Sequence, residues 1–308
     1  LFLLMAGMTS AFQMESLERK EPGARRRWWI SLKRAGYILG IAFTFRFTNW
    51  VFSVPHASVM EMTKVDILNC MGVGMAVLAV AAVFPSAARA RFALAGGLLI
   101  AAVSPLIAKL PSSGWPQLLQ EYVVPAGVRG RFAFFPWVAY IAFGLGLGTI
   151  VKRTAADRFE RLMQWSMLLG FALIFTGQYF SNLPISIYNG ANFWTDSPAL
   201  IVIRTGICMM IMAGAYLWTE YCGTEYCVGT GWSWMQAMGK NSLMVYWVHV
   251  MIVYGSLIRP WKRQLNIWQA GLATVVVTLM MVALSALWLE WKRRKAARAL
   301  ITSAPAAA

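Results

Sequence analysis

The sequence predicts an all-α fold, a polytopic bundle of transmembrane helices. Of its 308 residues, 59% are hydrophobic and only 13% are charged, whereas soluble domains carry about 25% charged residues. The apolar residues gather in about nine stretches, and clusters of basic residues separate these stretches. Because the bilayer core offers no water to unpaired backbone groups, such stretches are expected to cross it as helices.

The candidate spans follow one another along the whole chain. A transmembrane helix needs about 17–25 mainly apolar residues. The candidate ranges are 1–14, 35–54, 65–84, 92–109, 132–151, 162–181, 198–219, 238–258 and 268–290. The first begins inside an apolar run without a basic leader, so we expect an earlier span to be partly or wholly missing and about ten spans in the full-length protein. One transmembrane domain is predicted over 1–303, with a disordered Ala-rich tail at 304–308.

Lysine and arginine indicate the orientation of these spans. If the loop 15–34 is cytoplasmic, alternation places 19 basic residues on that side and seven on the other. This asymmetry follows the positive-inside rule, and it predicts a multi-pass protein of the inner, cytoplasmic membrane with a cytoplasmic C-terminus. The net charge of +16 is thus explained by topology, and no nucleic-acid partner is expected.

No metal site is predicted from the four cysteines. Cys70 and Cys208 lie inside apolar stretches, where a thiol usually serves as a small apolar side chain. Cys222 and Cys227 lie in a loop that we place in the cytoplasm, with only two glutamates nearby. A zinc site would need further ligands.

Polar residues inside the spans are functional candidates, because burying them in lipid is costly. One group falls in the outer halves of the spans: Arg46, Asn49, Asp66, Asn69, Gln178, Asn182 and Arg204. An ion pair between Arg46 and Asp66 would offset the cost of burying both, and it would explain both residues without further function. The alternative is an outward-facing pocket for a hydroxyl- or amine-bearing acceptor, with Asp66 as a catalytic candidate. In that pocket Arg46, Asn49, Asn69 and Arg204 would bind substrate.

A second group lies in the span 238–258. Ser242, Tyr246 and His249 are spaced i, i+4 and i+7, so they share one helix face. A neutral imidazole can accept or donate a proton, and Tyr246 could orient it, which makes both residues catalytic candidates. Asn241 and Ser242 are candidates for substrate binding. Spacing alone favours the simpler alternative, in which a carbonyl or hydroxyl of a neighbouring helix forms a hydrogen bond with His249.

The segment Gly239–His249 resembles a G-x-N-S-L-x-x-Y-x-x-H pattern of the heparan-α-glucosaminide N-acetyltransferase-like membrane proteins. Three further segments agree in order. Residues 1–7 are similar to the family's second membrane helix, residues 66–75 to its D-x-L-x-x-x-G-x-x-M helix start, and Pro136-Trp137 with the glycines at 144, 146 and 148 to its P-W segment. The resemblance therefore spans nearly the whole chain.

The resemblance implies a membrane acyltransferase that passes acetyl from cytoplasmic acetyl-CoA to a sugar or small-molecule acceptor on the far side. The basic loop 15–34 would then help to hold the phosphates of the donor. By the same resemblance, the family's catalytic histidine belongs to an outer loop upstream of Leu1, and His249 would play a supporting role. Expected partners are the lipid bilayer, acetyl-CoA and the acceptor, and a homodimer is left open.

Two other functions remain open on the sequence. In a transporter, Arg46, Asp66 and Arg204 would line a translocation path, although the paired broken helices of inverted-repeat transporters are not seen. In a non-catalytic accessory subunit, the same residues would serve structure alone. An upstream histidine would count against that second alternative.

Overall fold

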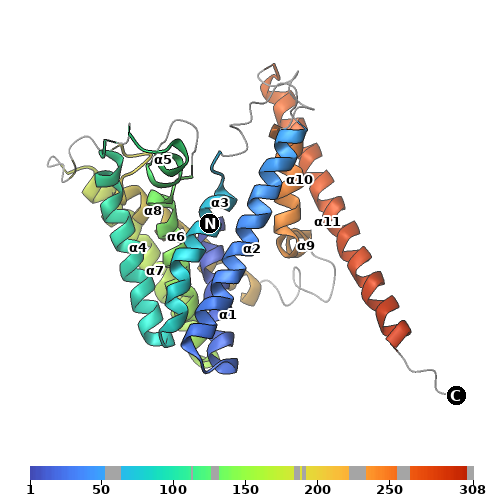
Figure 1. Ribbon diagram of the computed structural model, residues 1–308, viewed down its shortest axis with the longest axis horizontal. Helices are drawn as coiled ribbons and strands as arrows, with labels where there is room; N and C mark the ends of the chain where they lie inside the picture. Colours follow the sequence, from blue (N-terminus) through green and yellow to red (C-terminus); the bar gives the residue numbers. More distant parts are fainter. Residues whose placement is uncertain are drawn as a thin grey trace. The chain divides into compact units, whose positions relative to one another are not determined.

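The computed structural model describes residues 1–52, 64–111, 114–125, 132–183, 188, 192–221, 234–254 and 264–303. Throughout these ranges the regular elements are helices and no strand occurs, which confirms the all-α class. The chain divides into two compact units (Figure 1). The first comprises Leu1–Phe47 and Ser58–Trp218, and the second comprises Thr48–Ala57 and Thr219–Ala308.

The first unit is a bundle of helices arranged around α6. Its helices are α1 (Phe2–Lys20), α2 (Ala24–Val51), α3 (Ile67–Leu78), the 3-10 helix η2 (Ala79–Val83), α4 (Ser86–Ala108), α5 (Gln117–Val123), α6 (Phe134–Arg153), α7 (Ala156–Ser181) and α8 (Pro198–Leu217). Helix α6 contacts α1, α3, α4, α5 and α8, and α7 packs along α8. The last turn of α2 belongs to the second unit. Most of α6 is buried, so its side chains form the middle of this bundle.

Glycines bring α1 and α6 into backbone contact. A Cβ atom on Gly144 would lie 2.0 Å from the carbonyl oxygen of Leu4, and one on Gly7 would lie 2.1 Å from that of Ile141. One turn further along α6, a Cβ on Gly148 would lie 2.8 Å from the Cα of Met8. Small residues at such positions let two helices approach closely without a hydrophobic driving force between them, as membrane bundles require.

Four described helices are long and apolar enough to cross a membrane: Ser86–Ala108, Phe134–Arg153, Pro198–Tyr221 and Ile267–Lys295. Two shorter apolar helices cover Ile67–Val83 and Ser242–Val253. These helices support a multi-pass membrane protein, but the predicted count of about nine spans is not confirmed. The helices α1, α2 and α7 overlap predicted spans, yet their sequences are too polar or too weakly apolar to be counted with the four.

The second unit contains α9 (Trp234–Lys240), α10 (Ser242–Tyr254) and α11 (Ile267–Ser303). The predicted single span at 238–258 is therefore wrong in one respect, because the helix is interrupted at Asn241. Glycine and asparagine both have low helix propensity, and Gly239 and Asn241 stand on either side of Lys240 at this break. The predicted single domain over 1–303 stays a prediction, and the tail 304–308 lies outside the described residues.

Candidate functional site

The structure contains the ion pair between Arg46 of α2 and Asp66 that the sequence predicts. Both side chains are largely buried, at 13% and 21% exposed. Asp66 stands at the N-cap position of α3, yet its carboxylate makes no capping hydrogen bond and is committed to Arg46. Each of these buried charges is stabilised by the opposite charge beside it, since an unpaired charge would be costly there. Asn49 follows Arg46 by three residues on the same helix.

Two further polar side chains belong to this cluster. Asn69 is fully buried, and its Nδ2 atom donates to the carbonyl of Lys64 over 3.5 Å. Its Oδ1 atom and the Nε atom of Arg46 are both buried, and neither has a hydrogen-bond partner among the described residues. Burial raises the pKa of Tyr122 on α5; Arg46 opposes this rise and Asp66 adds to it, so the phenol lies within electrostatic reach of the pair. The sequence analysis missed Tyr122, because it lies in a short helix that matches no motif.

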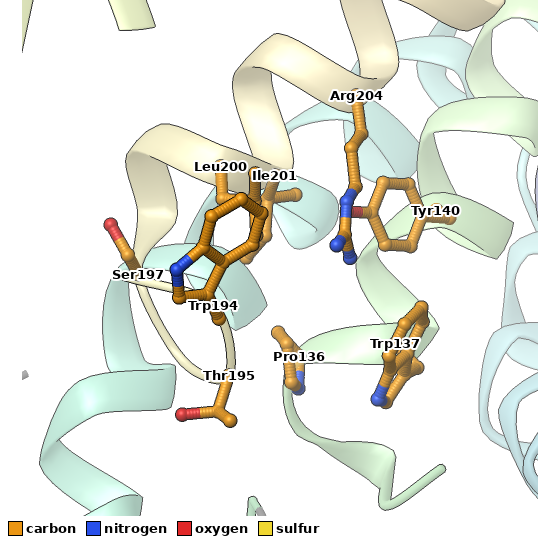
Figure 2. A pocket seen from close by; sticks show the side chains of 9 residues that line it. All are labelled: Pro136, Trp137, Tyr140, Trp194, Thr195, Ser197, Leu200, Ile201 and Arg204. Carbon is orange, nitrogen blue, oxygen red and sulfur yellow. The ribbon is translucent and has the colours of Figure 1, made fainter. Parts of the chain in front are cut away.

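A small, partly open pocket lies between the start of α6 and the start of α8 (Figure 2). Arg204 of α8 extends beside the phenol of Tyr140, and its guanidinium lies 5.7 Å from the centre of the Trp137 ring. That distance is within the range of a cation–π interaction. Trp194 borders the pocket from the other side and is 70% exposed. The sequence analysis singled out Arg204, but it gave no sign that these aromatic side chains would surround it.

Local structure explains how these side chains meet. The Phe135-Pro136 peptide bond is cis and Phe135 is extended, with φ −89° and ψ 128°, so regular helix in α6 begins beyond Phe135. On the other side, the turn before α8 is tied by Asp196. The buried carboxylate of this residue accepts the backbone N–H of Asn192 over 2.9 Å and the hydroxyl of Thr195 over 2.8 Å. These bonds hold Trp194 at the edge of the pocket.

A second charged cluster joins α4 to α1. The side chain of Arg89 is fully buried and donates to Glu18 over 2.5 Å and to Glu15 over 3.3 Å. It also donates to the carbonyls of Phe84, over 3.1 Å, and Ala81, over 3.4 Å. The sequence analysis took Arg89 only as a topology signal. Its burial could not be foreseen, because the two glutamates lie more than 70 residues away along the chain.

Near this cluster, the basic residues of the 15–34 segment divide into two sets. Arg27 donates to the carbonyl of Val83, and Arg34 pairs with Gln13, so both tie the helices together. The other set is exposed: Arg19, Lys20, Arg25, Arg26 and Lys33. Arg26 also pairs with Glu21 over 3.2 Å but stays 72% exposed. This second set, which we call the basic face, forms a cationic surface at the junction of α1 and α2.

The remaining candidates lie in the second unit. Asn241 is buried, and its Nδ2 atom donates to Ser285 Oγ over 3.1 Å and to the carbonyls of Ala237 and Ser285 over 3.3 Å. Ser285 in turn donates to the carbonyl of Ala237 over 2.6 Å. Asn241 thus links α9 to α11, and its predicted role in substrate binding stays a prediction. Ser242, which is exposed, and the half-buried Tyr246 and His249 all lie on α10.

Potential metal ligands do not assemble within the described residues. No group of three or more histidine, cysteine, aspartate or glutamate side chains occurs there. The described cysteines, Cys70 and Cys208, are both buried, and Cys222 and Cys227 lie outside the described residues. The Sγ atom of Cys70 donates instead to the carbonyl of Ala133 over 3.5 Å, which joins the start of α3 to the segment before α6.

The helical fold, its apolar helices and the buried polar clusters of its first unit define a multi-pass membrane protein. A comparison with protein families gives a match to the model of the heparan-alpha-glucosaminide N-acetyltransferase catalytic domain over residues 1–189. The chain belongs to this family, which confirms the resemblance drawn from its motifs. No curated protein and no solved structure matches it. The match includes the Arg46–Asp66 cluster and ends before Arg204 and α10.

Proposed function

We propose that this protein is an integral membrane acyltransferase of the inner membrane. It moves an acetyl group from cytoplasmic acetyl-CoA to a sugar or similar acceptor on the opposite side. The observation that carries the proposal is the family match, because it covers 189 residues and names a catalytic domain that transfers acetyl groups. The buried polar clusters add the kind of residues that a membrane protein retains for function.

The basic face suits the donor. Acetyl-CoA carries several phosphate charges. The exposed residues Arg19, Lys20, Arg25, Arg26 and Lys33 offer cations, and apart from Arg26 none of them pairs with an acidic side chain in the part of the chain that the structure describes. Arginine and lysine at a solvent-exposed surface attract phosphate by charge, and arginine can also bind it with two hydrogen bonds. When bound, the donor supplies an activated thioester. The residues of the basic face would hold its phosphates on the cytoplasmic side.

The acceptor is assigned to the opposite ends of the first-unit helices. The predicted topology puts the start of α3, α6 and α8 on the far side, together with the Arg46–Asp66 cluster. Asn69 Oδ1 can accept a hydrogen bond from a hydroxyl or amine and Arg46 Nε can donate one, and neither atom has a hydrogen-bond partner among the described residues. In the second unit, His249 is proposed as a supporting general base or transient acyl carrier, with Tyr246 orienting it.

Donor binding tests the proposal directly. Acetyl-CoA titrated into the purified full-length protein in lipid nanodiscs is expected to bind, and the double variant Arg25→Glu with Arg26→Glu is expected to weaken that binding. Arg158→Glu is the matched control, since Arg158 is an arginine on α7 that is 79% exposed. Absence of binding at millimolar acetyl-CoA would sink the proposal. Binding without transfer to any amine or hydroxyl would favour the accessory-subunit alternative.

Orientation is tested separately from activity. We propose that the C-terminus after α11 is cytoplasmic, because five basic residues follow its apolar stretch. A fluorescent reporter that folds only in the cytoplasm, fused to the C-terminus, is expected to be bright. An alkaline phosphatase fusion at the same place is expected to be inactive, and the reverse result would overturn the assigned orientation.

A further inference from the structure

Helix α11 is the least buried of the four long apolar helices. Only 11% of its most apolar stretch is buried within the structure, against 67% for α6. Trp268 and Trp288 stand near the two ends of this stretch, 20 residues apart, which corresponds to about 30 Å of helix, the thickness of a bilayer core. Both rings are exposed, at 85% and 38%. Since tryptophan collects at the two membrane–water interfaces, these residues place the apolar surface of α11 in the bilayer core, in contact with lipid.

The C-terminal end of this stretch carries two stacked tryptophans, each with a lysine over its ring. The ring centres of Trp288 and Trp291 lie 5.0 Å apart, and the angle between the ring planes is 28°. The ammonium of Lys292 lies 5.7 Å from the centre of the Trp288 ring, and that of Lys295 lies 5.2 Å from the centre of the Trp291 ring. Cation–π interactions at such distances position an ammonium without neutralising it. Because the four residues are spaced i, i+3, i+4 and i+7, they share one side of α11, which we call the lysine–tryptophan face.

Most of the positive charge on this segment has no acidic partner. Lys292, Arg293 and Lys295 form no salt bridge within the part of the chain that the structure describes, whereas Arg294 pairs with Glu290 over 2.5 Å. All of these basic side chains are exposed. Helix α11 continues beyond them, so the cations are carried on a regular helix directly after the interfacial tryptophans.

We infer that the lysine–tryptophan face binds the phosphate headgroup of an anionic phospholipid, such as phosphatidylglycerol, in the leaflet on the C-terminal side of α11. The two indoles lie at the membrane–water interface, and the two lysines extend from it toward the phosphate. The acyl chains lie along the exposed apolar surface of the same helix, to which Leu287 belongs. Clusters of basic residues immediately outside a transmembrane helix attract anionic lipids in this way. The inference depends neither on acetyl transfer nor on which side of the membrane this leaflet faces.

Two other occupants suit this face less well. A soluble phosphate compound would pair with the lysines, but it would leave the tryptophan pair, which suits a membrane interface, without a role. A second copy of the chain would bring the same positive charges against this segment, and like charges repel. One anionic lipid meets both requirements, because a single molecule carries the phosphate and the apolar chains.

Native mass spectrometry of the full chain, titrated with lipid in detergent, tests the inference. Phosphatidylglycerol and phosphatidylcholine with identical acyl chains are compared, and the anionic lipid is expected to bind about 10-fold or more tightly. Lys292→Gln combined with Lys295→Gln is expected to remove most of this preference. Lys292→Arg combined with Lys295→Arg should keep it, because arginine retains the charge and also binds phosphate.

Arg158→Gln combined with Arg161→Gln is the charge-matched control. These two arginines of α7 are also exposed and also stand three residues apart, so this variant loses the same charge from one helix. Its preference for phosphatidylglycerol should stay close to that of the unaltered chain. An equal loss in the α7 and α11 variants would mean that net charge alone attracts the lipid, and it would overturn the inference.

Further arms identify the ligand. Trp288→Leu combined with Trp291→Leu should lower the preference about 2- to 5-fold, since the lysines lose the rings that position them. Bound phosphatidylglycerol should withstand inorganic phosphate and acetyl-CoA, and displacement by either at equal concentration would assign the face to a soluble anion. Loss of the lipid when the chain dimerises would assign the face to a second copy, and either result would overturn the inference. Thermal unfolding in the same detergent shows that each variant is folded, and a folded Lys292→Gln, Lys295→Gln variant with undiminished preference would equally contradict the inference.

Discussion

The guanidinium of Arg89 on α4 donates to the carboxylate of Glu18 on α1 over 2.5 Å, with the arginine side chain fully buried. A second carboxylate, that of Glu15, lies 3.3 Å from the same group. Three charges and two backbone carbonyls thus form a network between helices that are distant in sequence. Removing one member of such a network leaves the others with a charge or hydrogen bond uncompensated.

We expect Arg89→Met to lower the free energy of unfolding by about 3–5 kcal/mol, because it leaves two partly buried carboxylates, those of Glu15 and Glu18, without their partner. Thermal unfolding in detergent measures the loss. Arg91→Met is the control, since Arg91 is exposed two residues further on. Adding Glu15→Gln and Glu18→Gln to Arg89→Met should recover part of the stability. Equal melting temperatures for the Arg89 and Arg91 variants would contradict the role of the network.

The close contact of α1 with α6 gives a second prediction. Gly144→Ala places a methyl group 2.0 Å from the Leu4 carbonyl oxygen, so the two backbones must separate. We expect a loss of about 1–3 kcal/mol, as for other overpacked interiors. Gly96→Ala is the matched control: Gly96 also lies in a helix, but a Cβ there meets no atom within 4 Å. That variant should be neutral or slightly stabilising, because alanine favours helix more than glycine does.

The Arg46–Asp66 pair gives a third prediction, which a double-mutant cycle tests. Arg46→Met and Asp66→Asn are each expected to destabilise, and the double variant should lose less than the sum, with a coupling of about 0.5–3 kcal/mol. The pair formed by Asp157 and Arg158 is the control. Its charges are 3.8 Å apart and more than 70% exposed, so its coupling should be close to zero. Additive losses at Arg46 and Asp66 would mean that the buried pair contributes nothing beyond each residue alone.

A variant at the neighbouring Asn69 separates structure from function. If the Arg46–Asp66 cluster binds the acceptor, Asn69→Ala should raise the KM for the acceptor more than it lowers stability. Asn69 Oδ1 has no described hydrogen-bond partner and the Nδ2 bond to the Lys64 carbonyl is long, at 3.5 Å, so the truncation costs the fold less than the loss of a well-formed buried hydrogen bond. Initial rates at varied acceptor and fixed acetyl-CoA measure this change. An unchanged KM would leave the cluster with a structural role alone.

Asn241 supports a prediction for the second unit. Asn241→Ala removes the hydrogen bonds that link α9 to α11, and we expect a local loss of about 1–3 kcal/mol. Hydrogen exchange along α9 and α11 reports this loss, since local opening exposes amides even where global melting changes little. Ser242→Ala, at the exposed neighbouring position, should not change exchange. Unaltered protection in Asn241→Ala would show that the amide is not needed to hold these helices.

A last prediction concerns His249. His249→Ala should lower turnover while leaving the melting temperature of the bundle nearly unchanged, because the side chain is only half-buried on α10. Turnover and melting are measured on the same preparation. Unchanged turnover would reduce His249 to a packing residue.

Hydrophobic stretches and charge located most of the helices in advance, because burial in lipid imposes long apolar runs. The Arg46–Asp66 pair was also foreseeable, since two opposite charges in adjacent apolar stretches need each other. The helix break at Asn241 was not foreseeable. The apolar run around it does not indicate that the buried Asn241 amide forms a hydrogen bond with Ser285 on another helix. The predicted count of about nine spans is not confirmed, because the described helices α1, α2 and α7 contain polar residues and are not among the four long apolar ones.

The surroundings of the site were less predictable than the fold. Arg204 stood out as a charge inside an apolar stretch, but Trp194 lies in a loop and reaches the pocket only through the turn held by Asp196. Arg89 was interpreted only as a cytoplasmic topology signal, and the two glutamates that pair with it, Glu15 and Glu18, belong to no recognisable motif. Such contacts depend on how helices pack in three dimensions, and neither spacing nor composition records that.

The glycine contacts also lock the register of α1 against α6. Both helices run in the same direction, with Leu4 beside Gly144, Met8 beside Gly148 and Phe12 beside Lys152. A slide by one helical turn, about 5.4 Å, would carry the Leu4 backbone onto Tyr140 or the Met8 backbone onto Lys152, where side chains block it. Sliding between α1 and α6 is therefore blocked, and a conformational change that keeps the two helices in contact moves them as a single body.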